Sequence, residues 1–209
     1  QEALQRAAAV APLQRVCAVV AAQHRQWWTA NLGGIADENV IVQPQNRGTA
    51  HGILLPLLRI MARDPDAIVV LLPADHYLRD EQTMAASLDR VTALAAADRD
   101  AIYLLGIEPE EADTELGYIV PNSGPRTQPA RVLRFIEKPT ATRAQALLNQ
   151  GAVWNAFIVA ASVRALLGLF DGSFDSTVAA MRYLKGPALD EFYQQLRSID
   201  FSRAVLQGN

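Results

Sequence analysis

Short apolar runs alternate with helix-forming stretches along the first half of the chain, and this alternation constrains the fold more than any other feature. The clearest run is Ala67-Ile68-Val69-Val70-Leu71, which contains no polar side chain. A strand that is apolar on both faces is typical of a parallel sheet covered by helices. Predicted strands at 15–20, 40–42, 67–71 and 101–106 alternate with helices, so the sequence predicts an α/β fold with a mostly parallel central sheet.

The helices between these strands are predicted from apolar stripes. The stripe that follows residue 48 consists of Ile53, Leu54, Leu57, Leu58 and Met61. Asp80 can cap the next helix, in which Met84, Leu88 and Val91 follow one another at spacings of four and three. Further helices are predicted at 1–9, 24–32, 143–148, 162–170, 175–183 and from 187 onward. Right-handed crossovers between parallel strands then favour a Rossmann-like three-layer sandwich.

The second half of the chain has a different pattern. Short strands at 117–121 and 132–137 flank the turn Asn122-Ser123-Gly124-Pro125, which indicates a hairpin rather than another strand–helix–strand unit. A further strand is predicted at 153–160. We therefore expect one domain over 1–209, with a nucleotide-binding half at 1–107 and a smaller β-rich, acceptor-binding half at 108–209.

Composition excludes several classes of function. The formal net charge of −3 and the pI of about 5.6 provide no basic surface for nucleic acid. No apolar stretch approaches the roughly 20 residues that span a membrane, so we expect no membrane partner. The single cysteine, Cys17, lies in an apolar run and has no internal disulfide partner, which favours a reduced, cytoplasmic location. Because the chain begins at Gln1 without methionine and stops at Asn209, we expect a fragment.

Asp75 follows the most apolar strand directly, in the stretch Leu72-Pro73-Ala74-Asp75-His76. In open α/β sheets, ligands bind at the carboxyl ends of the strands, so this carboxylate stands where such folds place their chemistry. A simpler interpretation is that Asp75 only caps the following turn. The residue alone does not decide between the two.

Other polar clusters interrupt apolar elements near strand ends. Gly48 and Thr49 at a helix start would leave backbone N–H groups for an anion or a base edge, although an ordinary helix N-terminus is an equal alternative. Asp75 and Asp200 could together bind Mg²⁺, which takes few carboxylates and completes its shell with water and phosphate oxygens. Lys138 offers a point charge for phosphate and Glu137 a carboxylate for hydroxyls, although for these two residues on their own a solvated surface pair is the favoured interpretation.

The order of these clusters resembles the sugar-phosphate nucleotidyltransferases, and most closely the mannose-1-phosphate guanylyltransferases (GDP-mannose pyrophosphorylases). The family pattern runs E-P-x-x-R-N-T-A-P-A, P-S/A-D-H, G-Y-G-Y-I, F-x-E-K-P, W-N-S-G-x-F and S-I-D-Y. The matching stretches here are 43–52, Pro73-Ala74-Asp75-His76, Leu116-Gly117-Tyr118-Ile119, Phe135-Ile136-Glu137-Lys138-Pro139, Trp154-Asn155-Ala156-Phe157 and Ser198-Ile199-Asp200-Phe201. The resemblance spans nearly the whole chain and implies a nucleotide-diphospho-sugar transferase fold.

The resemblance implies an enzyme that joins a nucleoside triphosphate and a sugar-1-phosphate to give a nucleotide-sugar and pyrophosphate, with GTP and mannose-1-phosphate as the closest match. The implied catalytic residues are Asp75, Asp200 and Lys138, with Asp75 and Asp200 as Mg²⁺ ligands. The implied nucleotide-binding residues are Pro44, Arg47, Gly48, Thr49 and Ala50, and the implied sugar-phosphate-binding residues are Gly117, Glu137, Lys138 and Asn155. The expected partners are these small-molecule substrates, and the resemblance leaves a homodimer open.

The chain also departs from the family pattern. The glycine-rich signature G-G-x-G-T-R-L-x-P-L would lie upstream of Gln1, and the W-x-D-x-G segment expected beyond Asp200 is missing. Gly48 replaces asparagine, His51 replaces proline, and the segment 154–157 lacks the usual glycine. These departures motivate a second hypothesis, a non-catalytic relative that binds nucleotide-sugar as a sensor or regulatory subunit.

Overall fold

The computed structural model describes residues 2–77, 80–122 and 128–207. Its strands are β1 (Ala18–Ala21), β2 (Val40–Gln43), β3 (Ile68–Leu71), β4 (Ile102–Ile107), β5 (Gly117–Pro121), β6 (Val132–Glu137) and β7 (Val153–Ser162). Its α-helices are α1 (Glu2–Val10), α2 (Arg25–Trp28), α3 (Gly48–Arg63), α4 (Glu81–Ala97), α5 (Ala141–Asn149), α6 (Val163–Gly168), α7 (Asp175–Tyr183) and α8 (Pro187–Gln195). Short 3₁₀ turns lie at Leu13–Arg15, Ala22–His24, Thr29–Asn31 and Asp37–Asn39, and Ser202–Leu206 is π-helical.

The apolar runs and stripes of the sequence correspond to elements of this structure, and the α/β fold class is confirmed. The predicted helix at 24–32 is the main exception, because only Arg25–Trp28 is α-helical and 3₁₀ turns flank it. Thr29 Oγ1 donates to the carbonyl of Arg25 and Asn31 Nδ2 to that of Trp27. Such side-chain bonds compete for the carbonyls that a longer helix would use.

Strand direction differs from the expected mostly parallel sheet. β1 and β2 pair in parallel, in a two-stranded sheet of their own. In the five-stranded sheet every recorded pair is antiparallel: β7 with β3, β4 and β5, and β5 with β6. The expectation rested on apolar runs, which indicate that a strand is buried and carry no information about the direction of its partner.

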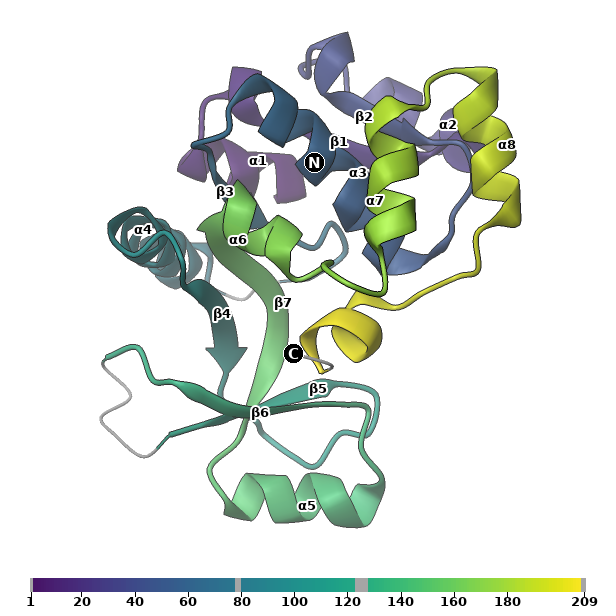
Figure 1. Ribbon diagram of the computed structural model, residues 1–209. Helices are drawn as coiled ribbons and strands as arrows, with labels where there is room; N and C mark the ends of the chain where they lie inside the picture. Colours follow the sequence, from purple (N-terminus) through teal and green to yellow (C-terminus); the bar gives the residue numbers. More distant parts are fainter. Residues whose placement is uncertain (1, 78–79, 123–127, 208–209) are drawn as a thin grey trace.

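β7 connects the two parts of the molecule (Figure 1). Its C-terminal end pairs with β3, and its first residues, Val153 and Trp154, pair with β5. β4 pairs along β7 from Trp154 to Ala161. The predicted hairpin is formed by β5 and β6, while residues 123–125 of its expected turn lie outside the described residues. One sheet therefore runs across the proposed boundary at residue 107, and the division into two functional halves stays a prediction.

Packing follows the apolar stripes. The main core joins α3 to α6, α7 and the C-terminal segment through fully buried side chains such as Leu54, Phe170 and Phe201. A second cluster packs Ala144 and Leu147 of α5 on the β5–β6 hairpin. Asp80 caps α4 as predicted, with its Oδ1 accepting from the backbone N–H groups of residues 82 and 83. Of the helices in the described part of the chain, none is both long and apolar enough to cross a membrane.

Candidate functional site

The start of α3 is joined to the segment that carries Asp200. The backbone N–H of Ala50 donates to the carbonyl of Ile199 over 3.1 Å, and the N–H of Ile199 donates to the carbonyl of Arg47, also over 3.1 Å. Two stretches from opposite ends of the sequence therefore run side by side, and we call this pairing the clasp. It brings the predicted nucleotide-binding segment next to one predicted metal ligand.

Gly48 makes the clasp possible. Its φ angle of 84° lies in the left-handed region, where side chains are strained. A Cβ atom at this position would lie 2.2 Å from the carbonyl oxygen of Ile199, well inside the contact distance of two heavy atoms. The replacement of the family's asparagine by glycine thus has a local reason, namely the close approach of these two backbones.

The expectation of free N–H groups at this helix start is wrong for two positions. The N–H of Gly48 donates to Asn46 Oδ1 over 3.0 Å, and the N–H of Ala50 is used by the clasp. Both donors are therefore satisfied within the protein.

Arg47 also has a structural role that the sequence did not predict. Its Nε donates to the carbonyl of Tyr193 over 2.8 Å, and its Nη2 donates to the carbonyl of Gln194 and to Gln45 Oε1. The guanidinium thereby holds the segment against the C-terminal end of α8. Pro44, which follows β2 directly, is half-buried. Contacts of Arg47 and Pro44 with a nucleotide stay predictions.

Thr49 orients the Asp200 segment. Its Oγ1 accepts from the N–H of Phe201 over 2.8 Å and donates to Asp200 Oδ2 over 3.4 Å. The other carboxylate oxygen, Asp200 Oδ1, accepts from the N–H of Arg203 over 2.9 Å. The Asp200 carboxylate is therefore held from two sides while the residue stays exposed.

Three predicted sugar-binding residues come together where β5, β6 and β7 meet. Gly117 lies opposite Glu137 in the β5–β6 pairing. A Cβ atom at Gly117 would lie 2.5 Å from Glu137 Oε2 and 3.5 Å from Asn155 Cβ. Asn155 Oδ1 accepts from the N–H of Phe157 over 3.1 Å. The missing side chain at Gly117 therefore leaves the room that the Glu137 carboxylate takes up.

Glu137 is also an electrostatic neighbour of Asp200. Burial raises the pKa of the Glu137 carboxyl above its usual value, and the negative charge of Asp200 raises it further, against the opposing effects of Lys138 and Arg203. The N–H of Glu137 donates to Gln207 Oε1 over 2.8 Å, which ties β6 to the C-terminal segment. The predicted sugar-binding cluster and the Asp200 end of the clasp thus form one region, which we call the acidic site.

Lys138 extends from the edge of this region. Its Nζ lies 3.2 Å from Glu115 Oε2, and both side chains are exposed, at 48% and 78%. An exposed ion pair of this kind is worth about 0–1 kcal/mol, so a phosphate group could displace Glu115 at little cost. Lys138, which directly follows Glu137, has a φ angle of 45°. Phe157, two positions after Asn155, has a φ angle of 53°. Strained backbone of this kind is concentrated at functional sites.

Asp75 lies in the loop after β3, as its position in the sequence predicted, and its side chain is exposed. In the described part of the chain, none of the recorded hydrogen bonds or ion pairs joins its carboxylate to Asp200, Glu137 or Lys138. The structure thus joins Thr49 to Asp200 and groups Gly117 with Glu137 and Asn155, and the charge of Asp200 acts on Glu137. It leaves the pairing of Asp75 with Asp200 as a prediction.

The fit of these residues to a divalent cation rests on their oxygen atoms. Glu137 and Asp200 repel each other through like charge, and Asp200 is exposed, which suits a hard cation that prefers carboxylate oxygens. Among the described residues, no three or more His, Cys, Asp or Glu side chains are grouped as a metal site. A Mg²⁺ ion bound through one or two carboxylates and phosphate oxygens needs no such group.

The sequence analysis missed the burial of His51. This residue is 1% exposed, and its Nδ1 lies 2.8 Å from the carbonyl oxygen of Arg47, within the clasp region. Its ring meets that of Phe174 edge-on at 6.2 Å. The available signal was its place four residues after Arg47, one helical turn along, where it can donate to that carbonyl.

An α/β sheet with polar side chains gathered at strand ends defines a ligand-binding class of protein, to which many enzymes belong. Residues 2–177 match the family model described as nucleotidyl transferase. The chain therefore belongs to the nucleotidyl transferase family.

Similarity to individual proteins agrees with this family. The xanthan biosynthesis protein XanB of Xanthomonas campestris pv. campestris (strain B100) is 33% identical over 123 residues, which cover 58% of this chain and 26% of XanB. A mannose-1-phosphate guanylyltransferase of Escherichia coli (strain K12) is 33% identical over 125 residues, covering 56% of this chain and 26% of that protein. The chain thus matches about a quarter of the length of these curated relatives.

A solved structure supports the fold over almost the whole chain. The protein described as mannose-1-phosphate geranyltransferase from Thermus thermophilus superposes with a TM-score of 0.85 at 27% identity. The superposition covers 98% of this chain and 59% of that one. The predicted nucleotide-diphospho-sugar transferase type of fold is confirmed by this match.

Proposed function

We propose that this chain provides the substrate-binding part of a sugar-phosphate nucleotidyltransferase, which joins a nucleoside triphosphate and a sugar-1-phosphate to give a nucleotide-sugar and pyrophosphate. The observation that carries the proposal is the acidic site, in which Gly117, Glu137 and Asn155 lie together and the charge of Asp200 acts on the Glu137 carboxyl. Membership of the nucleotidyl transferase family supports the reaction class.

In the proposed reaction, a phosphate oxygen of the sugar-1-phosphate attacks the α-phosphorus of the nucleoside triphosphate. The new bond forms there as the bond from the α-phosphorus to the bridging oxygen of pyrophosphate breaks, and pyrophosphate leaves with that electron pair. No side chain becomes covalently attached, so catalysis consists of holding both phosphates in line and neutralising their charge.

Each part of the site has a role in this proposal. Glu137 accepts hydrogen bonds from sugar hydroxyls, Asn155 lies beside it, and Lys138 neutralises the sugar phosphate. Asp200, which Thr49 orients, and Asp75 would hold Mg²⁺. When bound, this ion would neutralise phosphate charge and align the two substrates.

Guanylyl transfer to mannose-1-phosphate is the specific form of the proposal. Its support is the motif order in the sequence and the likeness to proteins named mannose-1-phosphate guanylyltransferase in Escherichia coli and Klebsiella pneumoniae. The base and the sugar depend on a few hydrogen bonds, so related sugar phosphates belong in every assay.

The test uses the intact protein. Pyrophosphate release from GTP and mannose-1-phosphate is measured with and without Mg²⁺, and then with other pairs of nucleotide and sugar phosphate. We expect release that requires Mg²⁺. Absence of release with every pair would overturn the proposal, and tight GDP-sugar binding without turnover would establish the non-catalytic hypothesis instead.

Two substitutions test the proposed role of Asp75. Asp75→Asn should lower kcat/KM by about a hundredfold or more, the order of magnitude seen when a group that stabilises charge in the transition state is lost. His76→Ala, at the next position, is the matched control and should change it little. Equal losses in the two variants would contradict the assignment.

A cytoplasmic location and a homodimer also stay predictions.

A further inference from the structure

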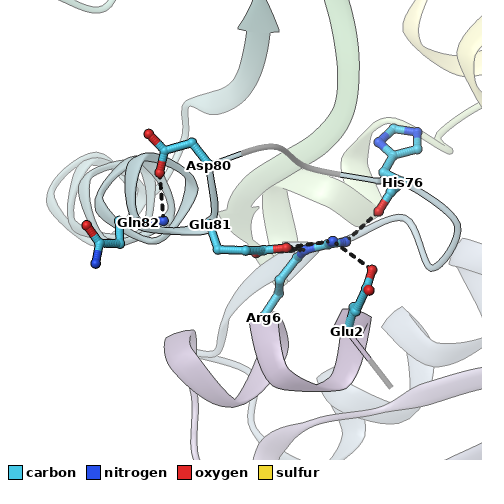
Figure 2. Close-up of polar contacts among 6 residues, drawn as sticks. All are labelled: Glu2, Arg6, His76, Asp80, Glu81 and Gln82. Carbon is cyan, nitrogen blue, oxygen red and sulfur yellow. Dashed lines mark hydrogen bonds and ion pairs between the residues drawn. The ribbon is translucent and has the colours of Figure 1, made fainter.

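A buried arginine joins α1 to the loop that carries Asp75. The Arg6 side chain is 8% exposed, although arginine is almost never fully buried unless it is paired. Figure 2 shows its guanidinium between the start of α4 and the loop after β3. None of the roles in the proposed function accounts for this residue.

One edge of the Arg6 guanidinium pairs with Glu81, at the first position of α4. Nε lies 3.0 Å from both carboxylate oxygens of Glu81, and Nη2 donates to Oε1 over 2.8 Å. Glu2, one turn earlier in α1, adds a looser contact at 3.6 Å. This two-point arrangement uses the planar fork of arginine, which lysine cannot reproduce.

The remaining nitrogen of Arg6 contacts the loop itself. Nη1 donates to the backbone carbonyl of His76 over 2.8 Å (Figure 2). His76 directly follows Asp75, and Pro73 lines a small cavity together with Arg6. Asp75 is therefore placed between a proline of restricted φ and a carbonyl whose direction Arg6 determines.

The far side of the loop is anchored independently. Asp80 caps α4 through the N–H groups of Gln82 and Thr83, and the Thr83 hydroxyl donates to its second oxygen over 2.7 Å. Docking of α1 on α4 also has an apolar part, because Val10 packs on the cluster that contains Met84 and Leu88. The ion pair with Glu81 can serve this docking, whereas the bond to the His76 carbonyl is the one contact of Arg6 recorded with the loop residues that the structure describes.

We propose that Arg6 is a positioning residue for Asp75: through the carbonyl of His76 it holds the loop in the orientation in which the Asp75 carboxylate takes part in cation binding. The inference rests on the proposed function of Asp75. It assigns to α1 a part in the site that none of the sequence motifs indicates.

The test separates loop positioning from helix docking. Arg6→Met removes both the ion pair and the bond to the loop. The double variant Arg6→Glu with Glu81→Arg exchanges the charges, which restores an ion pair between α1 and α4 but leaves position 6 without a donor for the His76 carbonyl. Arg143→Met, which removes an exposed arginine of α5, is the matched control.

Two measurements are made on each variant of the intact protein: the Mg²⁺ concentration that gives half-maximal pyrophosphate release, and the amide hydrogen exchange of residues 74–77. Loss of one hydrogen bond should raise the Mg²⁺ requirement and the exchange rate about fivefold in Arg6→Met. The double variant with swapped charges should bring the melting temperature back toward that of the parent. It should restore neither the Mg²⁺ requirement nor the hydrogen-exchange rate of the loop. Arg143→Met should match the parent in both.

The outcomes also distinguish this inference from the proposed function. If the double variant Arg6→Glu with Glu81→Arg has the Mg²⁺ requirement and the loop hydrogen-exchange rate of the parent, Arg6 only docks α1 and the inference is overturned. If the parent protein releases no pyrophosphate with any substrate pair, the proposed function fails and hydrogen exchange alone decides. Faster amide exchange at 74–77 in both Arg6 variants supports the hold on the loop, and unchanged exchange refutes it.

Discussion

Thr49 and Asp200 are 151 positions apart in the chain, yet the Thr49 hydroxyl lies 3.4 Å from Asp200 Oδ2. The same hydroxyl oxygen accepts a hydrogen bond from the N–H of Phe201 over 2.8 Å. A residue of the first half of the molecule therefore sets the orientation of a carboxylate close to the C-terminal end. This contact connects the proposed nucleotide segment to the proposed cation site, and the clasp beside it keeps both backbones in register.

Thr49→Val tests this contact. Valine has nearly the shape of threonine but no hydroxyl, so the N–H of Phe201 loses its acceptor and Asp200 loses a donor. We expect the free energy of unfolding to fall by about 1–2 kcal/mol, as for other buried donors left unpaired, with a loss of activity beyond what this destabilisation explains. Urea titration and steady-state kinetics measure the two effects.

Thr142→Val, on the exposed face of α5, is the matched control for the threonine substitution. It should leave both the unfolding free energy and kcat/KM close to the parent values. If Thr49→Val were as harmless as this control, the hydroxyl would have no part in orienting Asp200.

Gly48→Ala should destabilise the protein through two effects that a second glycine separates. Gly48 and Gly172 have nearly the same φ angle, 84° and 86°, but only at Gly48 would a Cβ atom meet backbone, at 2.2 Å from the Ile199 oxygen. Gly172→Ala should therefore cost only the conformational strain, about 1–2 kcal/mol. Gly48→Ala should cost clearly more. Equal losses in urea titrations would mean that the clasp yields to the methyl group.

His51 predicts a loss of stability in mild acid. Burial lowers the pKa of its imidazole below 6.5, the charge of Arg47 lowers it further, and the hydrogen bond to the Arg47 carbonyl opposes this. The folded state therefore binds the proton less readily than the unfolded state. This contribution to stability is complete above pH 6.5 and is lost as the pH falls from there toward the lower pKa of the folded state, with a slope of at most about 1.4 kcal/mol per pH unit.

The free energy of unfolding between about pH 7.5 and pH 5 measures this effect. In His51→Gln the part of the slope that belongs to this residue should disappear, while His24→Gln, which removes an exposed histidine, should keep the slope of the parent. An unchanged slope in His51→Gln would show that other groups cause the acid sensitivity.

Glu137→Gln should separate stability from function. The raised pKa of this carboxyl means that its ionised form is disfavoured in the folded state, mainly through burial and then through Asp200. The cost appears as the pH rises above the usual carboxyl pKa of about 4.5, so at pH 7 the neutral amide should unfold no more easily than the parent. Thermal unfolding at pH 5 and pH 7 checks this.

The same variant should bind sugar phosphate less well, because an amide can accept hydrogen bonds from sugar hydroxyls only at its oxygen, whereas a carboxylate can accept them at both oxygens. We expect KM for the sugar phosphate to rise about tenfold, with little change in KM for the nucleotide. Glu111→Gln, at an exposed position of the acidic loop, is the control. A variant that is destabilised and has an unchanged KM would reverse the roles assigned to Glu137.

Local sequence determined where the strands and helices lie and which side chains they expose. The apolar run predicted as a strand at 67–71 contains β3 at 68–71, the stripe through Leu54 and Leu57 forms the buried face of α3, and Asp80 caps α4. These features depend on residues within a few positions of one another, so their periodicity and capping chemistry are legible in a single sequence.

Tertiary structure decided strand direction and the composition of the site. β7 runs antiparallel to β3, β4 and β5, which lie far from it in the chain. An apolar run indicates that a strand is buried and does not indicate the direction of the strand with which it pairs. Other contacts also join distant elements. Arg47 donates to a carbonyl of α8, His51 is buried beside the Arg47 carbonyl, and Arg6 donates to the loop that carries Asp75. The sequence alone named the chemical groups of the candidate site, and long-range packing determined which of them meet.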